Sequence, residues 1–145
     1  MKKRDITTLS QLNRLAQDIA RRLKAPAWVY LTGDLGAGKT TFAQHFIAAL
    51  GYPDTVKSPT YALMEHYQTP AFPVLHMDLY RLSDPEELHF LGLDDALADN
   101  PVVLVEWPER GAGVLPPATL ALRFSQQGRQ RTVEIDDPLQ LFSIS

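Results

Sequence analysis

Apolar residues recur at helical spacing in two stretches of this chain. In residues 10–24 they repeat every three or four positions and polar residues fill the other face, a pattern that predicts an amphipathic helix. Ser10 is a suitable N-cap for this helix, and Pro26 ends the run. A second helix is predicted over residues 39–50, closed by Gly51.

Short apolar runs predict the strands. Residues 28–31 and 102–105 are almost entirely apolar, which is typical of strands buried on both faces of a parallel sheet. Turn-rich segments separate further strand-like runs, which predicts two antiparallel hairpins, 61–67 with 74–80 and 119–124 with 131–135. Ser83 is expected to cap an acidic helix that Gly92 interrupts.

Composition adds little to this order of elements. The chain has 145 residues, net charge −3 and no cysteine, which fits one α/β domain over residues 1–145 in a reducing cytoplasm. The basic start MKKRDITTLS precedes no apolar stretch, so no signal peptide or membrane anchor is expected. A net negative charge argues against broad nucleic-acid binding.

The segment between the first predicted strand and the helix at 39–50 is glycine-rich. Gly33, four residues, Gly38, Lys39 and Thr40 satisfy the phosphate-loop pattern G-x-x-x-x-G-K-[ST]. Glycines let backbone N–H groups turn toward an anion, the helix N-terminus adds positive potential, and lysine neutralises the outer phosphates. Thr40 offers a hydroxyl to Mg²⁺. The expected nucleotide-binding residues of the loop are Gly33, Asp34, Leu35, Gly36, Ala37, Gly38, Lys39, Thr40 and Thr41. This predicts a P-loop NTPase-like sheet, its parallel core extended by antiparallel hairpins and covered by helices on both faces.

Two apolar runs end in a carboxylate. Asp78 lies in VLHMDLYRL, and Glu106 follows four consecutive apolar residues in VVLVEWPE. A phosphate loop needs such an acid from a neighbouring strand to orient magnesium and its water. Asp78 could instead pair with Arg81, and Glu106 could cap its strand.

The segment VKSPTYALM has features of a nucleotide-dependent switch. Pro59 biases Ser58 toward an extended backbone. Ser58 and Thr60 carry hydroxyls in the loop that leaves the phosphate-loop helix. In a switch, such a segment senses the γ-phosphate. It could equally be an ordinary turn. The candidate switch residues are Ser58, Pro59, Thr60 and Tyr61.

Trp107 and Arg129 are further candidates for nucleotide contact. Trp107 could stack on a base or a partner, or simply pack. Arg129, in the QGRQR turn, could reach a phosphate or remain a solvated surface residue. The histidines have no zinc-ligand spacing, and three of the four are expected on element surfaces; they are His45, His66, His76 and His89.

Five segments in order resemble one known family. GDLGAGKTT, VKSPTY, HMDLYRL, EELHFLGL and LVEWPERGAGVLP, over residues 29–116, are similar to those of the TsaE (YjeE) family of small bacterial ATPases. The resemblance implies a role in N6-threonylcarbamoyladenosine synthesis at adenosine 37 of tRNA. It implies TsaD and TsaB as partners, with tRNA met only through that complex, and ATP hydrolysis that resets the complex between turnovers.

The resemblance also implies roles for individual residues. Lys39, Asp78 and Glu106 would be catalytic: Lys39 would bind phosphates, and Asp78 would orient the magnesium shell or attacking water. Thr40 and Glu106 would hold Mg²⁺. The SPTY segment would form the switch, Trp107 would lie beside the nucleotide, and Arg129 would contact ATP or its product ADP.

Two other functions are compatible with a phosphate loop. One is a small-metabolite phosphotransferase, against which the short chain and the lack of a lid insertion argue. The other is a nucleotide-binding adaptor that does not hydrolyse, with Asp78 structural. The guanine-recognising N-K-x-D element is absent, which favours ATP. With no unambiguous arginine finger, hydrolysis by the chain alone should be weak.

Overall fold

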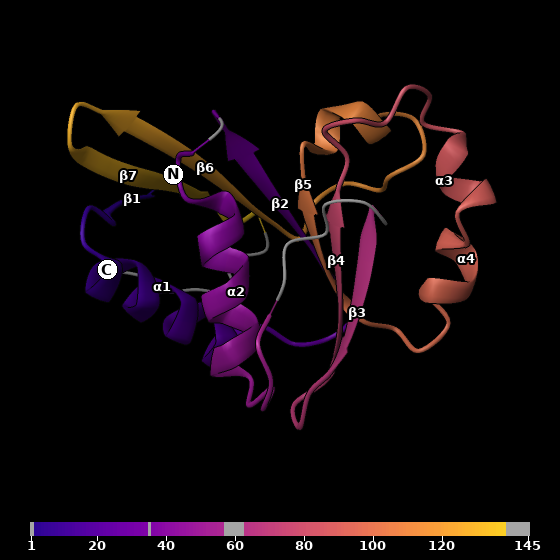
Figure 1. The fold of residues 1–145 in the computed structure, drawn as a ribbon, viewed down its shortest axis with the longest axis horizontal. Helices are drawn as coiled ribbons and strands as arrows, with labels where there is room; N and C mark the ends of the chain where they lie inside the picture. The colour runs from indigo at the N-terminus through magenta and orange to yellow at the C-terminus, as the bar shows by residue number, and fades with distance from the viewer. Residues whose placement is uncertain (1, 35, 57–62, 139–145) are drawn as a thin grey trace.

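The computed structural model describes residues 2–34, 36–56 and 63–138 (Figure 1). Within these residues one sheet of seven strands has the order β1-β7-β6-β2-β5-β4-β3. The strands are β1 Lys2–Asp5, β2 Ala27–Gly33, β3 Met64–Gln68, β4 Pro73–Asp78, β5 Val102–Glu106, β6 Leu120–Gln127 and β7 Gln130–Asp136. The helices are α1 Leu9–Arg22, α2 Lys39–Ala49, α3 Glu87–Phe90 and α4 Leu93–Ala96, with a 3₁₀ turn η1 at Pro108–Gly111.

The centre of the sheet is parallel and its margins are antiparallel. Strand β2 pairs in parallel with β5 and β6, and β5 pairs in parallel with β4. Strands β3 and β7 each return antiparallel to the strand next to them in sequence. Both predicted hairpins and the predicted fold class are thereby confirmed. Strand β6 has a double role, since it belongs to a hairpin and also to the parallel core.

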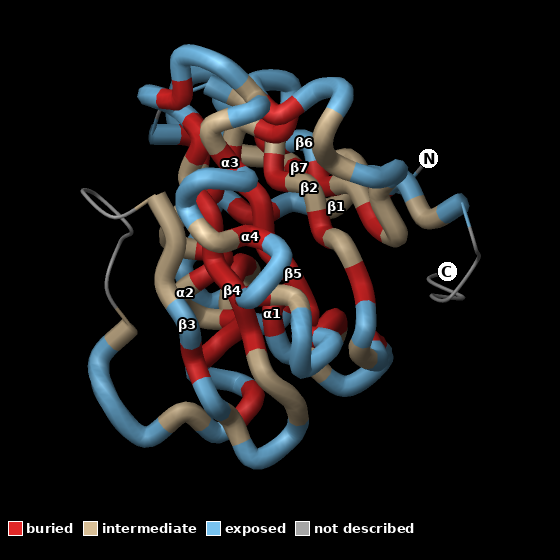
Figure 2. The backbone as a smooth tube through the Cα atoms, turned by 90° about the vertical axis from the view of Figure 1, so that its right-hand side faces the viewer, coloured by how far each residue is buried: buried red, intermediate tan, exposed pale blue. Residues whose placement is uncertain are grey.

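Helices cover both faces of the sheet (Figure 1). Because side chains alternate along a strand, Leu104 of β5 packs into the cluster under α1 and α2, whereas Val103 and Val105 pack into the cluster under α3 and α4. Every residue of β5 is buried. Figure 2 shows that buried residues follow the central strands through the molecule. The continuous apolar run therefore correctly predicts a strand covered on both sides.

Two helix starts differ from the prediction. Helix α1 is capped by Thr8, not Ser10: the Thr8 hydroxyl accepts the Gln11 backbone N–H, and the Gln11 side-chain oxygen accepts the Thr8 backbone N–H. Ser83 caps no helix either, because α3 begins only at Glu87 and the Asp84 carboxylate accepts the Glu86 N–H.

Strand β1 was not predicted from the sequence. It pairs antiparallel with β7, which places the basic N-terminus at the edge of the sheet. The break at Gly92 is confirmed, since this residue has φ +87° between α3 and α4. In the described part of the chain, no helix combines the length and apolar character needed to cross a membrane.

Candidate functional site

The glycine-rich loop joins the end of β2 to the start of α2. Gly33 has φ +128°, and a Cβ atom there would lie 2.3 Å from the Phe124 carbonyl oxygen on β6, so only glycine fits where the loop leaves the sheet. Gly38 has φ +115° and stands at the N-cap of α2. The loop therefore delivers the chain to a helix N-terminus, which attracts anions.

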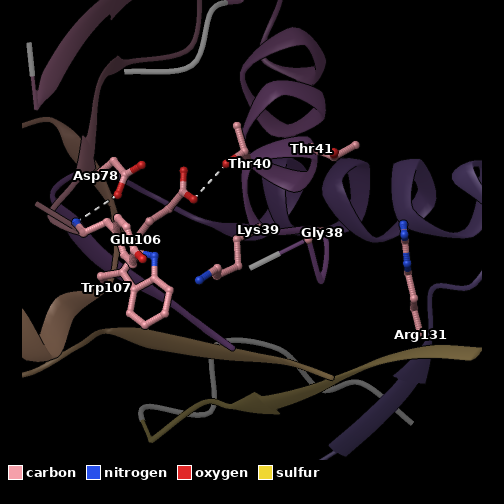
Figure 3. Close-up of a pocket in the computed structure, with 10 residues that line it drawn as sticks. Gly38, Lys39, Thr40, Thr41, Asp78, Glu106, Trp107 and Arg131 are labelled. Carbon is pink, nitrogen blue, oxygen red and sulfur yellow. Dashed lines mark hydrogen bonds between the residues drawn. The ribbon is translucent and has the colours of Figure 1, made fainter. Parts of the chain in front are cut away.

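Sheet register brings the two predicted acids to this helix end. Asp78 and Glu106 are direct neighbours in the parallel pair of β4 and β5, each at the carboxyl end of its strand. Leu104, two residues before Glu106, packs in the cluster beneath α1 and α2. Strand alternation puts Glu106 on that same face. Both acids therefore lie beside the loop (Figure 3).

Glu106 makes the central contacts of the site. It is 3% exposed, and its Oε1 accepts a 2.8 Å hydrogen bond from the Thr40 hydroxyl at the start of α2. Its Oε2 lies 2.7 Å from the Nε2 of His76 on β4. The carboxylate thus bonds side chains of α2 and β4, not backbone groups at the strand end.

Lys39 is 4% exposed and points into the site. Its Nζ donates a 2.6 Å hydrogen bond to the Gly33 carbonyl and lies 3.9 Å from the centroid of the Trp107 ring. Burial lowers the pKa of Lys39, and the carboxylates of Glu106 and Asp78 counteract part of that effect. A further anion beside this buried ammonium would stabilise its charged form.

Asp78 is half-buried, and its Oδ1 accepts the Tyr80 N–H at 3.1 Å. Burial raises the pKa of Asp78 and the nearby Glu106 raises it further, while the Tyr80 N–H counteracts this. Among the described residues no ion pair joins Asp78 to Arg81. The carboxylate instead faces the site, where a cation would lower its energy.

Trp107 follows Glu106 in an uncommon backbone conformation. With φ +59° and ψ +53° it is left-handed without being glycine, which costs about 1–3 kcal/mol. The turn places its ring over Lys39 and against the Tyr80 ring, 5.1 Å between centroids. The indole therefore forms a wall of the site and packs at the same time.

These side chains line a cleft of about 280 Å³. Eight of the lining residues were predicted from the sequence, and two, Tyr80 and Arg131, were not. Tyr80 belongs to the quoted HMDLYRL segment, two residues after Asp78, and its ring contact with Trp107 could not be read from spacing. The eight are Gly36, Gly38, Lys39, Thr40, Thr41, Asp78, Glu106 and Trp107.

Arg131 enters the cleft from β7. Its backbone is fixed by the N-terminal segment, since its carbonyl accepts the Ile6 N–H at 2.9 Å and its own N–H donates to the Thr7 hydroxyl at 3.0 Å. The predicted arginine, Arg129, is exposed in the turn between β6 and β7 and does not line the cleft.

The remaining predicted residues lie outside the cleft or outside the description. Gly33 supplies the sharp turn, Asp34 is exposed and Ala37 is buried. Leu35 and the predicted switch fall outside the described residues; the switch comprises Ser58, Pro59, Thr60 and Tyr61.

Oxygen donors at the helix start suit a hard cation. In octahedral Mg²⁺ with bonds of about 2.0–2.1 Å, adjacent ligand oxygens lie about 2.9 Å apart. Thr40 Oγ1 and Glu106 Oε1 are 2.8 Å apart, so the pair fits two such positions. Across the described chain, no group of three or more His, Cys, Asp or Glu side chains could hold a metal ion. Further ligands would have to come from phosphates and water, as is usual for Mg²⁺.

Comparisons with known proteins identify the family of this chain. A family profile described as threonylcarbamoyl adenosine biosynthesis protein TsaE matches residues 6–133. The chain is 44% identical over 107 residues to the tRNA threonylcarbamoyladenosine biosynthesis protein TsaE of Haemophilus influenzae, covering 74% of this chain and 68% of that one. The TsaE protein of Rickettsia bellii is 42% identical over 107 residues, covering 73% of this chain and 74% of that one.

A solved structure has the same fold. The crystal structure of Bacillus subtilis YdiB superposes with a TM-score of 0.72 at 28% identity, over 91% of this chain and 82% of that one. The profile match spans both the phosphate loop and β5, which carry the site. The chain belongs to the TsaE family.

Proposed function

We propose that this protein is a magnesium-dependent ATP-binding and hydrolysing subunit that is required for N6-threonylcarbamoyladenosine modification of tRNA at adenosine 37. Membership of the TsaE family and the printed names of its relatives support the pathway. The cleft at the phosphate loop supports the nucleotide chemistry. Residues 1–145 act as one domain in this proposal.

One observation carries the proposal. Thr40 and Glu106, from separate elements, hold their oxygens 2.8 Å apart at the N-terminus of α2, beside the buried ammonium of Lys39. A structural hydroxyl–carboxylate bond would not need a glycine loop, a helix N-terminus and a cation converging on it. A nucleoside triphosphate with Mg²⁺ binds to all three: the glycine loop, the helix N-terminus and the cation.

Each side chain then has a role. Lys39 binds the outer phosphates, and Thr40 and Glu106 hold Mg²⁺, which when bound neutralises charge that develops on the phosphates. Asp78 orients a water molecule or the magnesium shell, a role that suits a half-buried carboxylate beside Glu106. Trp107 shields the site from one side.

Weak activity alone and stimulation by partners complete the proposal. Of the described residues that line the cleft, Lys39 and Arg131 are the cations. In this proposal Lys39 binds the outer phosphates and Arg131 contributes to ATP binding, so neither is assigned to stabilise the transition state. We propose that TsaD and TsaB supply the missing order or charge and that hydrolysis resets their complex. The chain meets tRNA through that complex, in the cytoplasm.

The test is phosphate release from ATP with Mg²⁺, measured with and without TsaB and TsaD. We expect slow release by the chain alone and clear stimulation by the two partners together. Lys39→Ala and Glu106→Ala should each lower the stimulated rate by about 100-fold or more, because each removes a buried charged group that stabilises charge on the reacting phosphates.

Asp99→Ala is the matched control. Asp99 is exposed and precedes β5 at the end opposite Glu106, so its loss should leave the rate unchanged. Phosphorylation of a small acceptor without partners, or an unchanged rate in Glu106→Ala, would contradict the proposal. Nucleotide binding without phosphate release under any condition would favour an adaptor.

A further inference from the structure

His76 is a polar residue in the middle of the core. It lies on β4 between Leu75 and Met77, and all three side chains are 0% exposed. Burying a polar ring without hydrogen bonds destabilises a protein, so such residues normally have a specific partner. The proposed hydrolysis above assigns this histidine no role.

The only hydrogen bond of the ring within the described part of the chain goes to the candidate magnesium ligand. Nε2 lies 2.7 Å from Oε2 of Glu106, and Nδ1 has no partner among the described residues. Since a carboxylate accepts, Nε2 carries the proton and donates.

Because of this bond, the two carboxylate oxygens of Glu106 have different partners. Oε2 is tied to β4 by His76, and Oε1 faces α2, where the Thr40 hydroxyl donates to it. Without His76, the 3% exposed carboxylate could rotate, and Oε2 would be buried without a partner. The histidine thus fixes which oxygen faces the phosphate loop.

We propose that His76 is a positioning residue of the magnesium site, which holds Glu106 so that Oε1 is presented together with Thr40. The inference rests on the proposed function, because it assumes that Glu106 binds Mg²⁺. Groups that orient a metal ligand typically contribute about 10–100-fold to metal affinity. His76 touches neither nucleotide nor metal in this arrangement and acts through Glu106 alone.

Two amide variants separate positioning from simple packing. In His76→Gln the side-chain nitrogen reaches the position of Nε2, whereas in His76→Asn it reaches only that of Nδ1. Both keep a polar side chain on β4, and both leave Asp78, Lys39 and Thr40 untouched. A third variant, His76→Leu, removes the donor and leaves a side chain of similar size.

The experiment measures ADP binding by calorimetry as a function of Mg²⁺ concentration, and again in EDTA, for the full chain. ADP avoids turnover. We expect the Mg²⁺ concentration for half-maximal enhancement to rise about 10-fold or more in His76→Asn and His76→Leu, and to stay within about 3-fold of wild type in His76→Gln. Affinity in EDTA should be the same in all proteins that keep the wild-type melting transition.

The wild-type curve and the variant curves answer different questions. If the wild type shows no Mg²⁺ enhancement, the magnesium part of the proposed function fails and the inference falls with it. If the wild type is enhanced and His76→Asn has the same Mg²⁺ requirement, the inference alone is wrong. Equal loss in His76→Gln and His76→Asn, with weakened binding in EDTA as well, would assign the ring to packing and overturn the positioning role.

Discussion

The ammonium of Lys39 lies 3.9 Å from the centre of the Trp107 ring, a cation–π contact inside the phosphate-loop cleft. The same nitrogen donates to the Gly33 carbonyl at 2.6 Å. These two contacts hold the charge where the loop begins. Bound phosphates would compete for the ammonium with both the ring and the carbonyl.

The environment of Trp107 should therefore change when nucleotide binds. The chain has two tryptophans, Trp28 and Trp107, so a Trp28→Phe variant reports on Trp107 alone. We expect ATP or ADP with Mg²⁺ to change its emission in a saturable titration, because the cation over the indole is drawn to the phosphates. Trp107→Phe, which retains Trp28, should show no such change. Calorimetric binding without any emission change in Trp28→Phe would mean that Lys39 keeps its place over the ring.

A second prediction concerns the stability of the site. Burial raises the pKa of Asp78 above its ordinary value of 3.8, so the folded state holds its proton to higher pH than the unfolded state does. Stability from this group is present at low pH and is lost as the pH rises through the raised value. At neutral pH the ionised carboxylate therefore destabilises the fold.

Asp78→Asn should raise Tm at neutral pH, because it removes the charge that burial disfavours, while lowering ATP hydrolysis. Its amide oxygen can still accept the Tyr80 N–H. The gain should shrink as the pH falls toward 4, because the wild-type carboxyl becomes neutral too. Asp99→Asn, at an exposed position, should change Tm little at any pH. A gain for Asp78→Asn that grows on acidification would show that the sign of the pKa shift is wrong.

The two arginines of the last hairpin provide a matched pair. Arg131 lines the cleft, and Arg129 stands exposed in the turn only two positions away. Because a charge-assisted hydrogen bond is worth about 1.5–3 kcal/mol, Arg131→Ala should weaken ATP binding about 10-fold or more. Arg129→Ala should leave it unchanged. The reverse result in an equilibrium binding measurement would restore the sequence-based prediction for Arg129.

The positions of the residues near the glycine loop could be predicted because they follow from local spacing. A phosphate-binding loop is predicted from a strand followed by Gly33, Gly38 and Lys39, without knowledge of the rest of the fold. Four apolar residues before Glu106 likewise indicate the end of a buried strand. His76 and Arg131 could not be found in the same way. Their positions depend on which strands become neighbours in the sheet.

The position of His76 could not be predicted from the sequence because its strand is buried on both faces. Because the residues on either side of it, Leu75 and Met77, are both apolar and buried, no polar–apolar alternation indicates which face the ring takes. A signal does exist: His76 precedes Asp78 by two residues and so shares its face. Once Asp78 is placed beside Glu106, the histidine falls on the same side of the sheet.

Strand β1 was missed because it lacks apolar alternation. Its sequence KKRD is charged throughout, which suits an edge strand that must not pair with other molecules but gives no strand signal. The start of α1 was misread for another reason. Ser10 looks like a cap by residue type, whereas the pair of Thr8 and Gln11, three residues apart, is the capping box that the structure contains.

The cap is the basis of the last prediction. Thr8→Ala removes the hydroxyl that accepts the Gln11 N–H, which should lower the free energy of unfolding by about 0.5–2 kcal/mol. Ser10→Ala changes a residue inside the first turn and should have almost no effect, because alanine is favourable in a helix. Urea denaturation of both variants measures the difference directly. A larger loss in Ser10→Ala would put the start of α1 at Ser10, and the N-terminal segment that fixes Arg131 through Thr7 would then need another arrangement.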